Sequence, residues 1–106
     1  MNLVDESYKM TNDLPASEKF GLISQINRSA VSIASNIAEG SSKETDLHFI
    51  KYLADSLGSA FEWETQLIIC FRLGFINEKE FKTSEDRITM IQKKISSFID
   101  RLDKKS

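Results

Sequence analysis

The 106-residue chain has few of the residues that form turns, disulfides and metal sites. Its 1 Pro and 4 Gly are too few for the turns of a β-sandwich or β-barrel. A single Cys excludes an internal disulfide, and a single His excludes a His-rich metal site. The longest apolar run, residues 67–71, is too short to cross a bilayer, and no signal peptide opens the chain. These absences favour one small all-α domain over residues 1–106, located in the cytoplasm and without a membrane partner.

Charge of either sign is modest. The formal net charge of −2 provides no general attraction to nucleic acid. Cations nevertheless gather near the C-terminus, where they form either a nucleic-acid surface or a cationic helix end that complements the helix dipole. Together with one cation in the second helix, the candidate nucleic-acid contacts are Arg28, Lys93, Lys94, Arg101, Lys104 and Lys105.

Apolar residues recur at three- and four-residue steps, which predicts four helices. A short first helix ends before Pro15, and three long ones follow at about residues 16–39, 46–73 and 78–103. Gly40 and Gly74 are expected to end the second and third helices. Thr45 and Asn77 are the expected N-caps, with Ser41 as the alternative to Thr45. Short links between long helices predict an up-down antiparallel bundle.

The third helix is apolar on more than one side. One line contains Ile50, Leu53, Ala54, Leu57, Phe61, Ile68 and Phe71. A second group widens this surface beyond the arc of roughly 100° that one core needs. Because a bundle of ~100 residues is marginal alone, we expect this second group to contact another subunit. The apolar interface candidates are Phe49, Tyr52, Trp63, Leu67 and Cys70.

A polar stripe rich in serine runs along one side of the second helix, and the third helix carries a smaller group of polar residues as its counterpart. The stripe is either an ordinary solvated face or a partly buried hydrogen-bonded network, and its low content of Lys and Glu favours the network. Such a network would set helix register or subunit pairing. Its candidate members are Gln25, Arg28, Ser32, Ser35, Asn36, Glu39, Glu62, Thr65 and Gln66.

Catalytic signals are poor, so we expect no enzyme, cofactor, metal or small-molecule substrate. His48 is the only imidazole base, and it stands near a helix start. Cys70 lies within an apolar run, which is typical of a buried, inert thiol. The loop after Gly40 lacks the leading glycine and the preceding strand of a phosphate-binding loop.

The chain resembles the four-helix-bundle protein family, also called the 23S rRNA intervening-sequence protein family, from residue 8 to the C-terminus. The most distinctive block is Ser35-Asn36-Ile37-Ala38-Glu39-Gly40. Further matches are Leu14-Pro15, Glu18, Phe20-Gly21-Leu22, Ser24-Gln25-Ile26, Ser32-Ile33, Phe49, Leu53, Gly58-Ser59, Glu62, Thr65-Gln66-Leu67 and Leu73-Gly74.

The resemblance implies an up-down bundle that assembles as a ring, typically a homopentamer. It implies no catalytic or cofactor site, and in related proteins nucleic acid is a partner. The leading hypothesis is therefore a non-enzymatic scaffold that binds itself. The alternative is an RNA- or DNA-binding protein associated with ribosomal RNA insertions or retroelements.

Three residues depart from the family pattern. Asn27 replaces one of two paired Arg, which weakens the nucleic-acid hypothesis. Ala34 replaces a Pro and restores a backbone donor, so the second helix is expected to be straighter. His48 stands where Glu is common. The first helix also starts about a dozen residues late, so either the start lies upstream or a groove is open to a partner.

Overall fold

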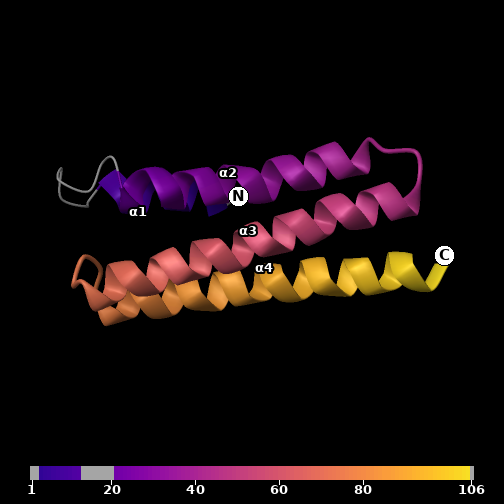
Figure 1. Cartoon of the computed structure of the whole chain (residues 1–106). Helices are drawn as coiled ribbons and strands as arrows, with labels where there is room; N and C mark the ends of the chain where they lie inside the picture. The colour runs from indigo at the N-terminus through magenta and orange to yellow at the C-terminus, as the bar shows by residue number, and fades with distance from the viewer. Residues whose placement is uncertain (1–2, 13–20, 106) are drawn as a thin grey trace.

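The computed structural model describes residues 3–12 and 21–105, which form an all-α four-helix bundle (Figure 1). The helices are α1 (Leu3–Asn12), α2 (Leu22–Ser41), α3 (Asp46–Arg72) and α4 (Glu78–Lys105). The predicted fold, with its short first helix, is confirmed. The predicted break at Pro15 lies outside the described residues. The second helix begins at Leu22 rather than at residue 16 as predicted, because its N-cap Gly21, with φ −106° and ψ −97°, is not helical.

The ends of α3 and α4 follow local sequence signals. The Thr45 side chain accepts a hydrogen bond from the backbone N–H of His48 at 3.2 Å, which confirms Thr45 as the N-cap. Asn77 Oδ1 accepts from the backbone N–H of Glu80 at 2.7 Å, and Glu80 Oε1 accepts from that of Asn77 at 2.9 Å. This reciprocal pair is a capping box. Gly74, with a φ of +78°, takes the left-handed conformation that follows α3.

Gly40 has a different role from the predicted one. It lies inside α2, which continues to Ser41, and within the described ranges only Gly74 has a positive φ. A Cβ atom built on Gly40 would lie 2.7 Å from Tyr52 Cβ and 2.8 Å from Phe49 Cδ1. The prediction of a left-handed helix end at Gly40 is therefore wrong. Glycine at this position allows α2 and α3 to approach closely.

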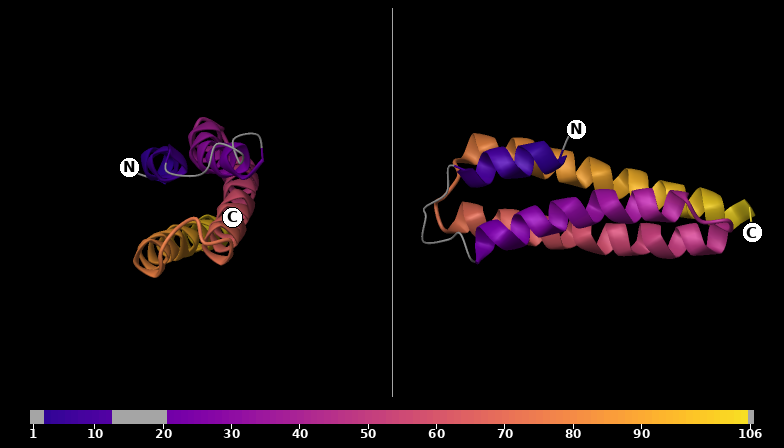
Figure 2. Two further views of the ribbon diagram at one scale, coloured as in Figure 1. Left: turned by 90° about the vertical axis from the view of Figure 1, so that its left-hand side faces the viewer. Right: turned by 90° about the horizontal axis from the view of Figure 1, so that it is seen from above.

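The core lies along α3, which packs against α2 on one side and α4 on the other (Figure 2). Ile26, Leu53, Trp63, Leu67 and Ile88 are at most 1% exposed. Two aromatic pairs join α3 to α4, with ring centroids 5.1 Å apart for Phe49–Phe98 and 4.4 Å apart for Phe71–Phe81. On α4, Ile88, Ile95 and Leu102 are buried and belong to the same core.

Helix α1 is held by both apolar and polar contacts, since Leu3 belongs to the core and Val4 and Met10 pack against it. Leu3, Ser7 and Thr11 form its buried face. Trp63 Nε1 donates to Ser7 Oγ at 3.2 Å, and Asn27 Nδ2 donates to Thr11 Oγ1 at 3.2 Å. Because α1 has 10 residues and α4 has 28, α1 lies beside the first part of α4 and leaves the later part uncovered (Figure 2, right).

Candidate functional site

A hydrogen-bonded network joins α2 to α3. Ser29 Oγ lies 2.9 Å from Glu62 Oε1 and 3.2 Å from Gln66 Oε1, both of which accept hydrogen bonds. Ser32 Oγ and Ser59 Oγ are 2.8 Å apart, and Asn36 Nδ2 donates to the Ser32 carbonyl at 2.9 Å. The network lies within one subunit, where its bonds between side chains of α2 and α3 favour one register.

The structure brings only some of the predicted polar residues together. Ser32, Asn36, Glu62 and Gln66 belong to the network. The exposed remainder, Gln25, Arg28, Ser35, Glu39 and Thr65, makes no bond between α2 and α3 in the described part of the chain. Ser35 and Thr65 instead donate to carbonyls one turn earlier in their own helices, at 2.9 and 3.1 Å.

Sequence reasoning missed three network serines. Ser29 and Ser56 are buried, at 2% and 0% exposure, and Ser59 contacts Ser32. Ser56 Oγ donates to the Ile33 carbonyl at 2.8 Å. Spacing is the only available signal for two of them, because Ser29 lies three residues before Ser32 and Ser59 three residues before Glu62. Ser56 has no such spacing from a predicted member.

The apolar interface candidates lie mostly inside the subunit. Trp63, Leu67 and Cys70 are at most 1% exposed, so their assignment to a contact with another subunit is corrected. They face the core of their own bundle because α3 turns this side toward α2 and α4. Phe49 and Tyr52 are half-buried. The Phe49 ring packs edge-on against the Phe98 ring, and Lys43 Nζ lies 5.2 Å from the centroid of the Tyr52 ring.

The opposite side of α3 carries the exposed apolar residues instead. Four large side chains are exposed there or at the end of the helix: Leu47 at 71%, Phe61 at 52%, Ile69 at 41% and Leu73 at 57%. Small exposed residues, Ala54 and Gly58, lie between them. We call these six residues the α3 outer face. Its apolar character is unusual for solvent-facing helix positions.

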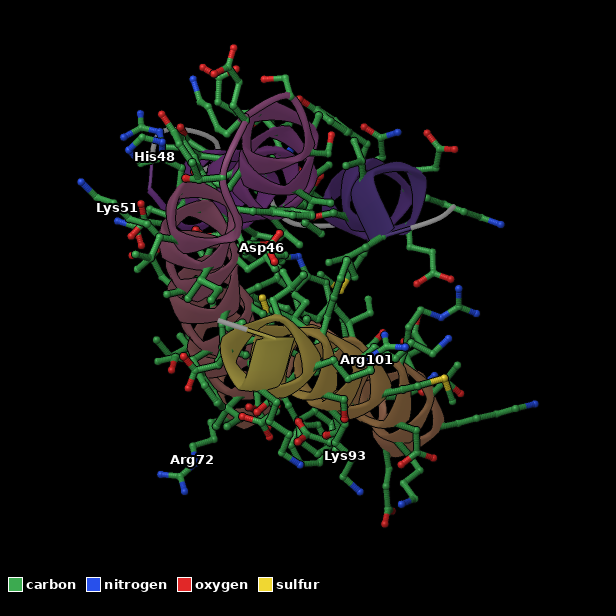
Figure 3. The ribbon with its side chains drawn as sticks, turned by 90° about the vertical axis from the view of Figure 1, so that its right-hand side faces the viewer. Asp46, His48, Lys51, Arg72, Lys93 and Arg101 are labelled. Carbon is green, nitrogen blue, oxygen red and sulfur yellow. The ribbon has the colours of Figure 1, made fainter. Side chains whose placement is uncertain are left out.

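The candidate nucleic-acid contacts do not form one cluster. Lys93, Lys94, Arg101 and Lys104 are exposed on α4, whereas Arg28 is exposed on α2. None of these five side chains makes an ion pair with a described residue. Figure 3 shows Arg101 on the side of α4 that faces α1 and Lys93 on another side. The Lys105 side chain is not among the side chains that the structure describes.

A carboxyl pair joins α3 to α4 beside the core. The hydrogen bond that Glu85 donates to Glu64, reinforced by burial and by the charges of Glu64 and Asp86, raises the pKa of Glu85 to about 7. Lys82 opposes this shift. The same hydrogen bond lowers the pKa of Glu64, whose Oε1 also accepts from Gln92 Nε2 at 2.8 Å. The buried Oε2 of Glu85 has no donor facing it, so the arrangement favours one shared proton.

We expect the free energy of unfolding to fall between pH 6 and pH 8.5. The pKa of Glu85 is raised from 4.5 to about 7 in the folded protein, so this stabilisation is complete below pH 4.5 and is lost as pH rises through 7. A loss of about 1 kcal/mol is expected for this partly hydrated pair. Urea unfolding at both pH values should show that Glu85→Gln removes this change and Asp100→Asn keeps it. Equal pH dependence in both variants would contradict the assignment.

The described residues meet the requirements of neither a metal site nor a membrane-spanning helix. Across residues 3–12 and 21–105, no group of three His, Cys, Asp or Glu side chains is placed to bind a metal ion. In the same ranges, no helix combines the length and apolarity that spanning a bilayer requires. His48 is an exposed first-turn residue of α3 (Figure 3).

Comparisons with known proteins agree with this architecture. A solved structure of a protein with unknown function from the S23 ribosomal protein family of Bacteroides thetaiotaomicron is similar, with 28% identity and a TM-score of 0.79. The similarity covers 91% of this chain and 87% of that chain. No curated protein matches the sequence. Neither the solved structure nor the matching family model indicates an enzyme family. The model of the 23S rRNA-intervening sequence protein matches residues 1–97, and the chain therefore belongs to this family.

Proposed function

We propose that the protein is a non-enzymatic, self-assembling helical bundle that acts in the cytoplasm as a binding or assembly scaffold. The α3 outer face carries this proposal, because four of the seven large apolar side chains that are exposed among the described residues belong to it. Large exposed apolar side chains that recur along one side of a helix, interrupted here by Thr65, favour a protein–protein contact. Ala54 and Gly58 leave room for another helix to approach the backbone closely.

A closed ring of identical subunits, a pentamer, is the form of assembly that we propose. A ring needs two different faces that contact each other head to tail. The other exposed large apolar side chains of the described residues, Tyr8, Val31 and Met90, lie one each on α1, α2 and α4. The second contact of a ring would therefore use a part of the subunit away from α3. Repetition around a ring would also multiply the cations of α4.

Light scattering coupled to size-exclusion chromatography tests self-assembly. At micromolar concentration we expect a mass five times the subunit's 12.1 kDa, unchanged on modest dilution. Another stable multiple would keep the scaffold and correct the ring size. A single 12.1 kDa species at these concentrations would contradict self-assembly.

Nucleic-acid binding is the second candidate function, favoured by the exposed cations of α4. Lys93 and Lys104 make no ion pair with a described residue, so both are available to phosphate groups. The net charge of −2 and the distant position of Arg28 make this candidate the weaker one.

Titration of a labelled single-stranded RNA at several salt concentrations tests the second candidate. Binding should weaken as salt rises, and Lys93→Ala/Lys104→Ala should reduce the slope of log K against log salt by about 1 to 2 per subunit. Lys51→Ala, on α3, is the matched control and should leave the slope unchanged. No binding at low salt, or an equal slope in all variants, would exclude this function.

A further inference from the structure

A groove lies along the middle of α4. A hollow of about 620 Å³ begins at Leu3, where α1 starts, and is lined on α4 by Met90, Ile91 and Lys94. A second hollow of about 390 Å³ continues past Met90 and Lys94 to Phe98 and Arg101. Because the two hollows share Met90 and Lys94, they form one continuous surface. We call these six residues the α4 groove.

The α4 groove combines an apolar floor with a basic edge. Met90 is 56% exposed, and Ile91 and Phe98 are half-buried, so apolar area remains open to solvent. Lys94 and Arg101 are both exposed, and neither makes an ion pair with a described residue. Arg101 lies over the Phe98 ring, 5.3 Å from its centroid, on the side of α4 that faces α1 (Figure 3). Asp86, which lines the first hollow, is paired with Lys82 at 3.1 Å.

Helix α1 shows what kind of element fits beside α4. Glu6 of α1 forms an ion pair with Arg87 of α4 at 2.7 Å, while Leu3 is buried beside the groove. Arg87, Lys94 and Arg101 follow one another at seven-residue steps, so their side chains lie along one side of α4. Seven residues of helix span about 10.5 Å. A helix that continues the line of α1 would therefore meet Lys94 and Arg101 at successive heptads.

We infer that the α4 groove binds an acidic amphipathic helix of a partner protein. Its apolar residues would cover Met90, Ile91 and Phe98, and its carboxylates would pair with Lys94 and Arg101, as Glu6 pairs with Arg87. A helix is favoured over a nucleic acid because the two cations border apolar side chains, which an amphipathic helix covers and a phosphate backbone does not. The inference does not depend on self-assembly, because every residue of the groove belongs to one subunit.

Two synthetic peptides serve as probes. Each is a helical peptide of about 18 residues with leucine at heptad positions a and d, and the flanking positions carry glutamate in one peptide and lysine in the other. Fluorescence anisotropy should show that the glutamate peptide binds the full chain and that the lysine peptide binds at least about tenfold more weakly. Lys94→Glu/Arg101→Glu should reverse this preference. The matched control, Arg28→Glu/Lys51→Glu, makes the same charge change away from the groove and should leave it unchanged.

The outcomes that overturn the inference are distinct. Equal binding of both peptides, absence of glutamate-peptide binding up to millimolar concentration, or an equal effect of both double variants would overturn it. A single-stranded RNA that displaces the glutamate peptide and loses affinity for Lys94→Glu/Arg101→Glu would assign the groove to nucleic acid instead. A smaller solution mass for that variant alone would assign it to a second copy of the chain.

Discussion

Replacement of Trp63 by alanine is expected to lower the free energy of unfolding by about 3–5 kcal/mol. Trp63 is 1% exposed and is the largest fully buried side chain among the described residues. Its removal would leave a cavity between the helices and would also remove the indole donor that bonds Ser7 at 3.2 Å. We therefore expect both a weaker core and a loosened α1.

Urea unfolding followed by circular dichroism measures this loss, since Trp63 is the only tryptophan and its fluorescence disappears with it. Asp55→Ala is the control, because Asp55 is an exposed residue of α3 that does not belong to the α3 outer face. Its effect should stay below about 1 kcal/mol. Trp63→Phe should lie between the two, because it keeps most of the volume and loses the bond to Ser7. Similar losses for Trp63→Ala and Asp55→Ala would contradict the placement of the core.

Replacement of Gly40 by alanine is expected to cost about 2 kcal/mol, although alanine is normally the better helix former. The added methyl group would lie 2.7 Å from Tyr52 Cβ, an atom that cannot move without the α3 backbone. Accommodating it requires α2 and α3 to separate at this close approach.

Gly58→Ala provides the opposite expectation. Gly58 is also helical, but nothing lies within 4 Å of a Cβ built on it. In the single subunit that Phe61→Glu is expected to give, alanine there should raise the free energy of unfolding by about 0.5–1 kcal/mol, because it lowers the entropy of the unfolded chain. Thermal unfolding of both variants at equal protein concentration compares them. A gain in stability for Gly40→Ala would show that the close approach does not exist.

Local signals were sufficient to predict the ends of α3 and α4. Thr45, Gly74 and Asn77 act through hydrogen bonds or backbone angles within a few residues, so the sequence around each one contains the whole cause. Gly40 could not be predicted in the same way. Its role depends on Phe49 and Tyr52, which approach it only after α2 and α3 have packed.

A second limit of prediction from sequence concerns which side of α3 faces the core. Periodicity predicts that apolar residues share a side, but a helix that is apolar on two sides contains no signal for which one faces its own core. Ala54 and Phe61 were placed on the core side, whereas both are exposed. Trp63 and Leu67, which we assigned to another subunit, are the core itself. The network serines Ser29 and Ser56 escaped prediction for a related reason, since serine is common on both buried and solvated helix faces.

Sedimentation velocity of Phe61→Glu tests most directly the claim that the α3 outer face joins subunits. Glutamate at this exposed position should be tolerated by the fold and should place a charge in the proposed contact. We expect the wild type and the control Ser24→Glu, an exposed position on α2, to sediment as the same multiple of 12.1 kDa. Phe61→Glu should sediment as a folded single subunit. An assembly of unchanged mass in Phe61→Glu, or a monomeric wild type, would contradict the claim.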